Sequence, residues 1–122
     1  MKALLLVAHG SQKKVSNDEI RSLALKLAQD PRHAFDQVEC AFLEFAEPSI
    51  PEGISACIRQ GAKYITVLPY FLSSGHHVSV DIPAELEKAQ RNNSQVQFKM
   101  APYLGTAEEI SDILLLLSAR TV

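Results

Sequence analysis

The stretch ALLLVAHGS, residues 3–11, decides the fold, because an apolar, β-rich run passes directly into a polar turn that contains a glycine. The same arrangement returns in YITVLPYFLSSGHH, residues 64–77, where a second apolar run enters a loop rich in serine and histidine. Loops that follow parallel strands share one edge of the sheet, and ligands of α/β proteins usually bind at that edge. Histidines from both loops are therefore expected to face one crevice, which suggests a metal site or a proton-transfer site.

The rest of the chain alternates between strand and helix patterns. Strands are expected at about residues 3–8, 37–44, 63–69 and 95–101. Helices are expected at about residues 16–29, 82–90 and 106–119, with a further helix between Pro48 and Gly61. This alternation predicts an α/β fold, an open four-stranded parallel sheet with helices on both faces. A flavodoxin-like strand order of 2-1-3-4 would place the first and third strands side by side.

Caps and apolar stripes support these helices. Ser16 and Asn17 are expected to cap the first helix, and Asp81 is expected to cap the one that begins at Ile82. Apolar residues recur at helical spacing in the first helix, at Ile20, Leu23, Ala24 and Leu27. The last helix has one apolar face that consists of Ile110, Ile113, Leu114 and Leu117.

Composition narrows the class of protein. The 122 residues are 47% hydrophobic and 21% charged, which predicts a single globular domain over residues 1–122. A formal charge of −2 does not favour a nucleic-acid partner. No apolar run approaches the roughly 20 residues of a membrane helix, and the start of the chain lacks the pattern of a secretory signal, so a cytoplasmic location is expected. Cys40 and Cys57 form no metal-binding motif and are expected to be reduced core residues.

The four histidines differ in how strongly their sequence positions indicate a functional role. His9 ends a strand and precedes a glycine that lets the backbone approach a ligand closely, so a functional role is favoured. His76 and His77 are adjacent in a segment expected to be extended, so at most one of them should face the crevice. Glu44 ends the second strand and either reaches the same rim or is an ordinary surface carboxylate. His33, in a polar turn, is expected to be structural.

Imidazole and carboxylate together suit Fe, Co, Ni, Zn or Cu. A site with only two or three protein ligands leaves coordination positions for a substrate, as a catalytic or transfer site requires. Nucleotide chemistry is disfavoured, because neither a GxGxxG nor a Walker A loop follows the first strand.

Three motifs resemble the sirohydrochlorin chelatases of the short CbiX type, which insert metals without ATP. They are HGS at residues 9–11, FLEFAEPSI at residues 42–50 and FLSSGHHVSVDIP at residues 71–83. The resemblance covers essentially the whole chain in order and spacing, and it implies a half-chelatase unit. The third motif is long and specific, whereas HGS alone is weak.

The resemblance implies that His9 and His77 bind the metal and, with Glu44, form the catalytic set. His76 falls on a variable position of the third motif, and Gln12 stands where many relatives have an arginine. Lys13 or Lys14 could supply the missing charge. The implied reaction is insertion of Co²⁺ or Fe²⁺, or Ni²⁺ in some relatives, into sirohydrochlorin in cobalamin or sirohaem synthesis. The metal is then a substrate, no nucleotide is used, and the family implies a homodimer.

Metal insertion releases two pyrrole N–H protons, so a base must accept them. Glu44 or a free imidazole could do so, and the substrate carboxylates could be held by Ser11, Ser73, Ser74 and the loop backbone at Gly75. The main alternative is a non-catalytic metal or tetrapyrrole carrier with the same fold, which would bind stoichiometrically without turnover. A metal-assisted hydrolase is weaker, because no nucleophile stands out.

Overall fold

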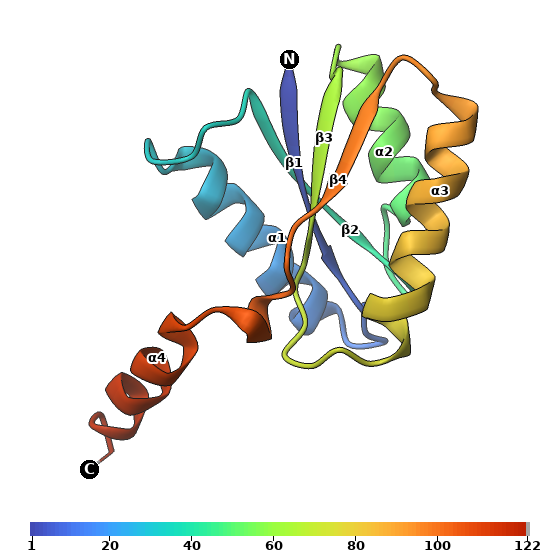
Figure 1. The fold of residues 1–122 in the computed structure, drawn as a ribbon. Coiled ribbons are helices and arrows are strands. Elements are labelled where there is room, and N and C mark those ends of the chain that lie inside the picture. The colour runs from blue at the N-terminus through green and yellow to red at the C-terminus, as the bar shows by residue number, and fades with distance from the viewer. Residues whose placement is uncertain (122) are drawn as a thin grey trace.

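A computed structural model describes residues 1–121 of the chain (Figure 1). The elements are, in order, β1 (Lys2–Ala8), α1 (Lys14–Gln29), β2 (Gln37–Phe42), α2 (Ile50–Arg59), β3 (Tyr64–Pro69), the π-helix η1 (His77–Asp81), α3 (Ile82–Asn92), β4 (Gln97–Met100), the 3₁₀-helix η2 (Leu104–Thr106) and α4 (Glu109–Ser118). No helix within residues 1–121 is both long and apolar enough to cross a membrane.

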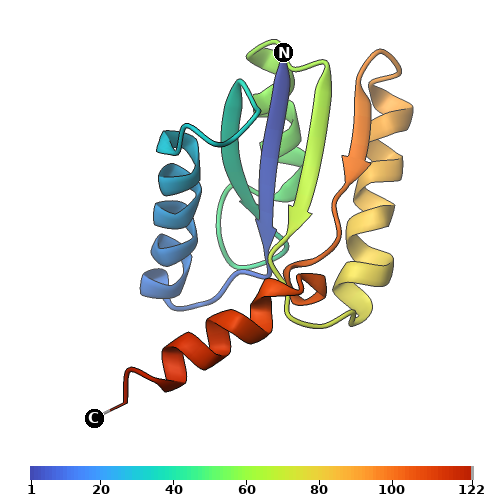
Figure 2. The same ribbon diagram turned by 60° about the vertical axis from the view of Figure 1, so that its left-hand side comes forward.

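The four strands form one parallel sheet in the order β2-β1-β3-β4, so the predicted fold class and strand order are confirmed. β1 lies in the middle and pairs with β2 on one side and β3 on the other, and residues Ala3 to Ala8 are buried. A strand covered on both faces needs apolar residues throughout, which explains the unbroken run in its sequence. All four strands run the same way, so the loops after β1 and β3 emerge at one edge (Figure 2).

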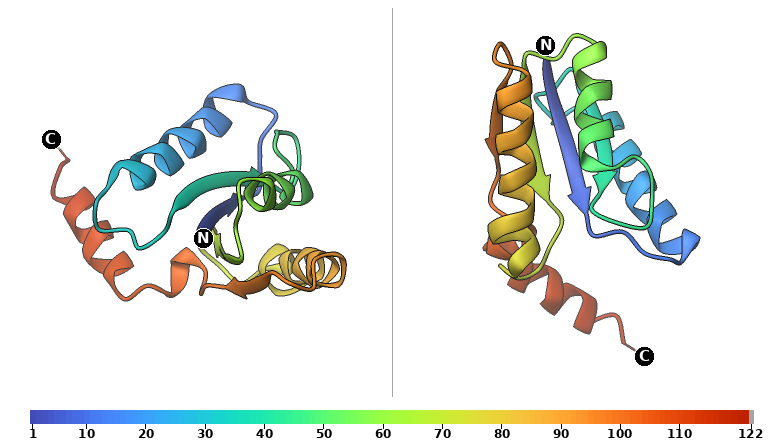
Figure 3. Two further views of the ribbon diagram at one scale, coloured as in Figure 1. Left: turned by 90° about the horizontal axis from the view of Figure 1, so that it is seen from above. Right: turned by 90° about the vertical axis from the view of Figure 1, so that its right-hand side faces the viewer.

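Helices lie on both sides of the sheet. On one face, α2 and α3 pack on Leu5 and Val67 through Ile54 and Ile82, all nearly or fully buried. On the other face α1 packs on β2, where it covers the fully buried Phe42. The view from above in Figure 3 separates these layers, with α1 on one side of the strands and α2 and α3 on the other.

The last helix departs from the expected packing. α4 projects from the body on the α1 side, beyond the carboxyl edge of the sheet (Figures 1 and 2). Of the apolar face predicted from the sequence, Ile113, Leu114 and Leu117 are exposed and only Ile110 is half-buried. The stripe therefore predicted a helix correctly, but its apolar face is not buried against the described part of this chain.

α2 is capped as its sequence suggests. The Ser49 hydroxyl accepts a hydrogen bond from the Glu52 amide, and the Glu52 carboxylate accepts one from the Ser49 amide. This reciprocal pair satisfies two backbone donors that a helix start leaves free. Gly61, at φ +104°, follows the end of the helix in the conformation that glycine adopts most readily.

Other boundaries required correction. β2 ends at Phe42 and not near residue 44, because the following loop folds back and the Phe42 amide bonds to the Pro48 carbonyl at 2.9 Å. The first helix begins at Lys14 with Lys13 as its N-cap, so the predicted caps Ser16 and Asn17 lie inside it.

The prediction for Asp81 was also wrong. Its backbone is helical and its side chain caps nothing, because the chain is already in the π-helix before α3 begins.

The two cysteines are free, as predicted. Cys57 on α2 is fully buried, whereas Cys40 on β2 is half-buried. Burial raises the pKa of the Cys57 thiol to about 11 and also raises that of Cys40. Both thiols therefore stay protonated, and poorly nucleophilic, near neutral pH.

Candidate functional site

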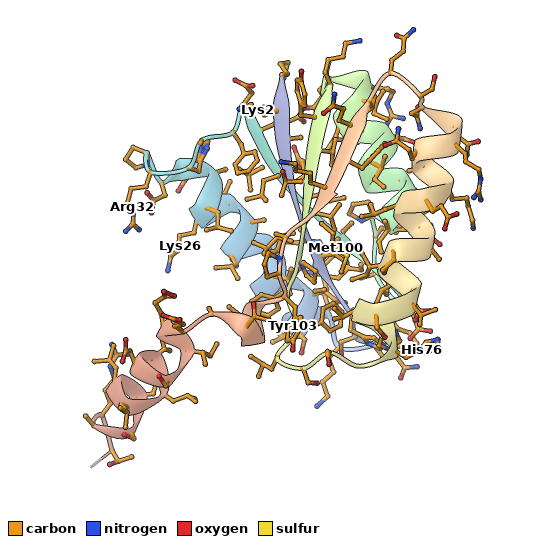
Figure 4. All side chains as sticks on the ribbon, in the orientation of Figure 1. Lys2, Lys26, Arg32, His76, Met100 and Tyr103 are labelled. Carbon is orange, nitrogen blue, oxygen red and sulfur yellow. The ribbon has the colours of Figure 1, made fainter. Side chains whose placement is uncertain are left out.

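The two predicted histidine loops meet at the carboxyl edge of the sheet. His9 directly follows β1, and His77 opens the π-helix that follows β3. Their ring centroids lie 4.7 Å apart, with the ring planes inclined by 54°. Figure 4 shows the neighbouring His76 at this same edge, at the start of the helical segment that continues into α3. The loops thus bring together two imidazoles that are 68 residues apart in the sequence.

The hydrogen bonds of His9 determine which ring nitrogen is free. Its Nδ1 lies 2.9 Å from the carbonyl oxygen of Gly10. A carbonyl oxygen only accepts, so Nδ1 carries the proton and Nε2 of the neutral ring presents a lone pair. That Nε2 lies 3.1 Å from Oε2 of Glu44. Two acceptors this close require a shared proton or a cation between them, which is the expected chemistry of a proton-transfer or metal site.

His77 is oriented in the same way by a carboxylate. Its Nδ1 lies 2.7 Å from Oδ2 of Asp81, four residues on. The carboxylate accepts the Nδ1 proton, so the Nε2 lone pair of His77 is free. A carboxylate behind an imidazole fixes the tautomer and raises the basicity of the opposite nitrogen, as is common behind metal-binding histidines.

The π-helix selects which histidine of the pair faces the site. His76 and His77 are helical and not extended as expected, and the amide of Ile82 reaches back five residues to the carbonyl of His77. His77 contacts the His9 ring and is half-buried. His76 is 72% exposed and its Nε2 lies 3.5 Å from Oδ1 of Asp81. The structure therefore places His77, and not His76, beside His9.

The His9 and Glu44 loops are joined through their backbones. The Glu44 amide donates to the His9 carbonyl at 2.9 Å, and the Leu43 amide donates to that of Ala8 at 3.0 Å. Gly10 has φ +92°, and a Cβ added there would lie 1.8 Å from the Glu44 carbonyl oxygen. Only glycine fits this close approach. As a result, the imidazole of His9 and the carboxylate of Glu44 are held in a fixed relation.

Asn17 holds the first loop in place, a role the sequence did not reveal. It is 6% exposed, and its amide group bonds both ways to Ser11, with Oδ1 2.9 Å from the Ser11 amide and Nδ2 2.7 Å from its carbonyl. The sequence predicted Asn17 as a cap of the first helix. Only the tertiary structure shows that its side chain bonds to Ser11 instead.

Arg21 braces the loop after β2. It donates to the Glu47 carbonyl at 2.7 Å and to Asp18 at 3.0 Å, and its guanidinium lies 5.1 Å from the centre of the Phe42 ring. The bonds from Lys14 and Arg21 lower the pKa of Asp18. This loop carries Glu44, so Arg21 supports the same side of the site.

The predicted substrate-contacting residues lie around the rim. Ser11 is half-buried and its hydroxyl accepts from the Lys13 amide at 3.0 Å. Ser73, Ser74 and Gly75 are exposed on the loop after β3. The Gly75 carbonyl accepts from the amides of Val78 and Ser79, so this residue also starts the helical segment.

Hollows on both sides of the histidine pair give access to it. One of about 770 Å³ runs beside α1 and includes His9, Ser11 and Phe71. Another of about 270 Å³ includes Glu44, His77 and Asp81. Within residues 1–121, no group of three or more His, Cys, Asp and Glu side chains could hold a metal ion. A metal at the histidine pair would therefore keep most of its coordination positions for other ligands.

Comparison with known protein families gives a match to CbiX over residues 3–120. The chain belongs to the CbiX family. This confirms the resemblance that the three motifs indicated. The "Sirohydrochlorin cobaltochelatase" of Methanocaldococcus jannaschii is 42% identical over 93 residues, which cover 76% of this CbiX chain and 64% of that protein.

Two solved structures share the fold. A "putative cobalamin (vitamin B12) biosynthesis CbiX protein" from Marinobacter aquaeolei VT8 is 26% identical with a TM-score of 0.80, and the match covers 99% of this chain and 100% of that one. The sirohydrochlorin chelatase SirB from Bacillus subtilis subspecies spizizenii, in complex with cobalt, is 29% identical with a TM-score of 0.84. That match covers 97% of this chain but only 50% of SirB.

Proposed function

We propose that this CbiX protein inserts a divalent metal, Co²⁺ or Fe²⁺ and by the same chemistry Ni²⁺, into sirohydrochlorin without a nucleotide. The observation that carries the proposal is the His9–His77 pair, in which both Nδ1 atoms are engaged and both Nε2 atoms are left to bind a metal, that of His9 beside the Glu44 carboxylate. The names of its relatives, among them a cobaltochelatase and a chelatase in complex with cobalt, support the same reaction.

The histidine pair holds the metal substrate before transfer. Neutral imidazole binds Co²⁺, Fe²⁺ and Ni²⁺, so the two rings do not discriminate strongly among these ions. A pair of protein ligands leaves the other coordination positions open to the incoming pyrrole nitrogens. Weak protein coordination also favours release, because the macrocycle replaces two imidazoles with four nitrogens.

Glu44 receives the protons that the macrocycle releases. Insertion of one M²⁺ displaces two pyrrole N–H protons, so the charge of the macrocycle complex is unchanged and two protons must leave. The Glu44 carboxylate is 53% exposed and lies 3.1 Å from His9 Nε2. The carboxylate can therefore accept one proton at the site and release it to water. It is then free to accept the second pyrrole proton.

The rim holds the acidic side chains of the tetrapyrrole. Ser11, Ser73 and Ser74 supply hydroxyl donors, and Gly75 supplies backbone at the open end of the loop. On the Ser11 side of the rim, a hollow of about 540 Å³ includes Ser11, Gln12, Lys14 and Arg21. Lys14, whose side chain is 85% exposed, can supply there the positive charge that Gln12 lacks, whereas Arg21 is already bonded to Asp18 and to the Glu47 carbonyl.

A homodimer completes the site. Residues 1–122 form one chelatase unit, and a broad, flat macrocycle needs a second wall opposite the first. The match of this chain to half of SirB supports a pairing of two such units, which a two-fold axis supplies when the units are separate chains. We assign the protein to the cytoplasm.

The test is a spectral assay of sirohydrochlorin with Co²⁺, Fe²⁺ or Ni²⁺, with protein well below substrate. His9→Ala and His77→Ala are expected to lose turnover at least about 100-fold, because each removes a metal ligand. His76→Ala is the matched control, since it deletes an exposed imidazole next to the site, and it is expected to keep most of the activity.

Three results would oppose the proposal. A spectral change proportional to the amount of protein would indicate a carrier instead of an enzyme. Equal activity in the wild type and both site variants would remove the histidine pair from the reaction. No response to any of the three metals would leave the fold without this function.

A further inference from the structure

Phe45, in the loop after β2, has a backbone conformation that phenylalanine rarely adopts. Its φ is +65°, and the Ala46 amide donates to the Glu44 carbonyl at 2.8 Å, which is the hydrogen bond of a γ-turn. In a bulky residue a positive φ is an outlier that the surrounding structure must hold in place. Glycine or asparagine would take this position at lower cost. The turn alone therefore does not explain why the residue is phenylalanine.

The loop is anchored on both sides of Phe45. Before the turn, the Glu44 amide donates to the His9 carbonyl at 2.9 Å. After it, the Glu47 carbonyl accepts from the Arg21 guanidinium at 2.7 Å. These bonds keep the strained turn in one conformation, so the position of the Phe45 side chain is set by the loop that carries Glu44.

The ring of Phe45 contributes little to the core. The residue is 58% exposed, whereas Phe42, three residues earlier on β2, is fully buried. An exposed ring leaves in water the apolar area whose burial would have stabilised the fold. The protein thus bears a strained backbone and an exposed ring at the same residue. Strained residues of this kind gather at functional sites, where the conformation serves a ligand.

Phe45 lies at one end of a series of neighbouring rings that contains the histidine pair. Its ring centroid is 6.2 Å from that of His9, with the planes inclined by 58°. The His9 ring is 4.7 Å from His77, which in turn is 6.2 Å from Phe71. Phe71 is half-buried and packs against the core. Of the two phenylalanines, Phe45 is therefore the one whose ring is open to a ligand.

Phe45 also borders the hollow that includes Ser11, Gln12 and Lys14. It therefore lies between two parts of the proposed tetrapyrrole site, the histidine pair for the metal and the Lys14 side of the rim for the carboxylates. In a tetrapyrrole, the apolar ring carbons lie between the central nitrogens and the acidic side chains. The part of the substrate next to Phe45 is then the flat, apolar face of a pyrrole ring, which an aromatic side chain binds well.

We propose that Phe45 packs against the face of one pyrrole ring and holds the macrocycle in place beside His9. The inference rests on the proposed function and adds a substrate-contacting residue to the metal ligands and the base. The contact needs no metal and uses neither histidine lone pair. It should therefore raise the affinity for the tetrapyrrole and leave the affinity for the metal unchanged.

Titration of the full-length protein with metal-free sirohydrochlorin, followed by the absorption of the tetrapyrrole, tests the contact. Phe45→Ala is expected to raise the Kd by about 10-fold, the effect of losing one aromatic contact. Phe45→Tyr keeps the ring and should bind within about 2-fold of the wild type. Leu25→Ala, which removes a side chain that is 60% exposed on α1, is the matched control and should leave the Kd unchanged.

Phe45→Gly separates loss of the ring from damage to the fold. Glycine adopts a positive φ without strain, so the midpoint of urea unfolding should not fall. Sirohydrochlorin should nevertheless bind as weakly as it does to Phe45→Ala. The Co²⁺ affinity, measured from the visible absorption of the bound ion, should match the wild type in both variants. A parallel fall in Co²⁺ affinity would overturn the inference, because Phe45 would then act by supporting His9.

Other outcomes separate this inference from the proposed function. Unchanged sirohydrochlorin affinity in Phe45→Ala and Phe45→Gly, with normal turnover, would refute only the Phe45 contact. The same affinities together with altered sedimentation would overturn it as well and would place the ring between two copies of the chain. Weaker binding by these variants of a protein whose wild type shows no turnover would keep the contact and refute the chelatase activity. A wild type that does not bind sirohydrochlorin would refute both.

Discussion

The direction of each site imidazole depends on a neighbouring acceptor, and the two acceptors differ in kind. His9 is held by the backbone carbonyl of Gly10, which no side-chain substitution removes. His77 is held by the carboxylate of Asp81, which a substitution can change. His77 is therefore the histidine whose proposed metal affinity can be adjusted without replacing the imidazole itself.

Asp81→Asn tests this dependence. The amide can turn either an oxygen or a donor NH₂ group towards His77 Nδ1, so the tautomer is no longer fixed and the basicity of Nε2 falls. We expect Co²⁺ affinity to fall by about 10- to 100-fold, the usual effect of losing such a partner, as measured by titration of the visible Co²⁺ absorption. Glu87→Gln, at an exposed position of α3, is the control, and equal Co²⁺ affinities in all three proteins would contradict the assignment.

The residues of the candidate site were easier to predict from the sequence than the residues that hold them in position. His9, His77 and Glu44 could be predicted because strand ends and a long motif marked them. Their roles in metal binding and proton transfer remain predictions. Asp81 and Asn17 were interpreted as helix caps, since Asp and Asn favour that role locally. Each instead bonds to a group that is near only in the folded chain or in the π-helix, and residue type alone does not show this.

At the scale of the elements, the N-terminus of α2 is stabilised by a capping box that its own sequence supplies. Ser49→Ala removes the hydroxyl that accepts from the Glu52 amide and should lower the free energy of unfolding by about 1 kcal/mol. Urea denaturation followed by circular dichroism measures the change. Ser55→Ala, at an exposed position inside the same helix, should alter stability much less, and equal losses in both variants would rule out a special contribution from the cap.

Element type was easier to predict than element partners. All four strands and four α-helices occur where periodicity placed them, with ends shifted by a few residues. The shifts have local causes, such as the loop that returns to the Phe42 amide after β2. The apolar stripe of α4 correctly predicted a helix. A stripe does not identify the surface on which a helix packs, and here the stripe is not buried against the described part of the same chain.

At the scale of the whole molecule, the strand order could be predicted because alternating units with right-handed crossovers leave few arrangements. The proposed homodimer adds a consequence for stability, since the folded state then depends on mass action. Raising the protein concentration from about 5 µM to about 500 µM should raise the melting temperature by several degrees. Differential scanning fluorimetry at both ends of this range measures the shift.

A wild-type melting temperature that is independent of concentration would contradict a folded state linked to dimer formation.

The π-helix has a consequence for how this chain can vary in length. Successive residues of an ordinary α-helix are rotated by about 100° about its axis, whereas the wide turn from His77 to Ile82 takes up one residue more than an ordinary turn. Deleting one residue there would let an ordinary α-helical turn form and leave Ile82 in the core. The position of His77 around the helix axis would then rotate, and its ring would turn away from His9. The number of residues between Gly75 and Ile82 thus encodes the direction of the imidazole. Insertions and deletions should be rarer in this segment than substitutions at its exposed positions.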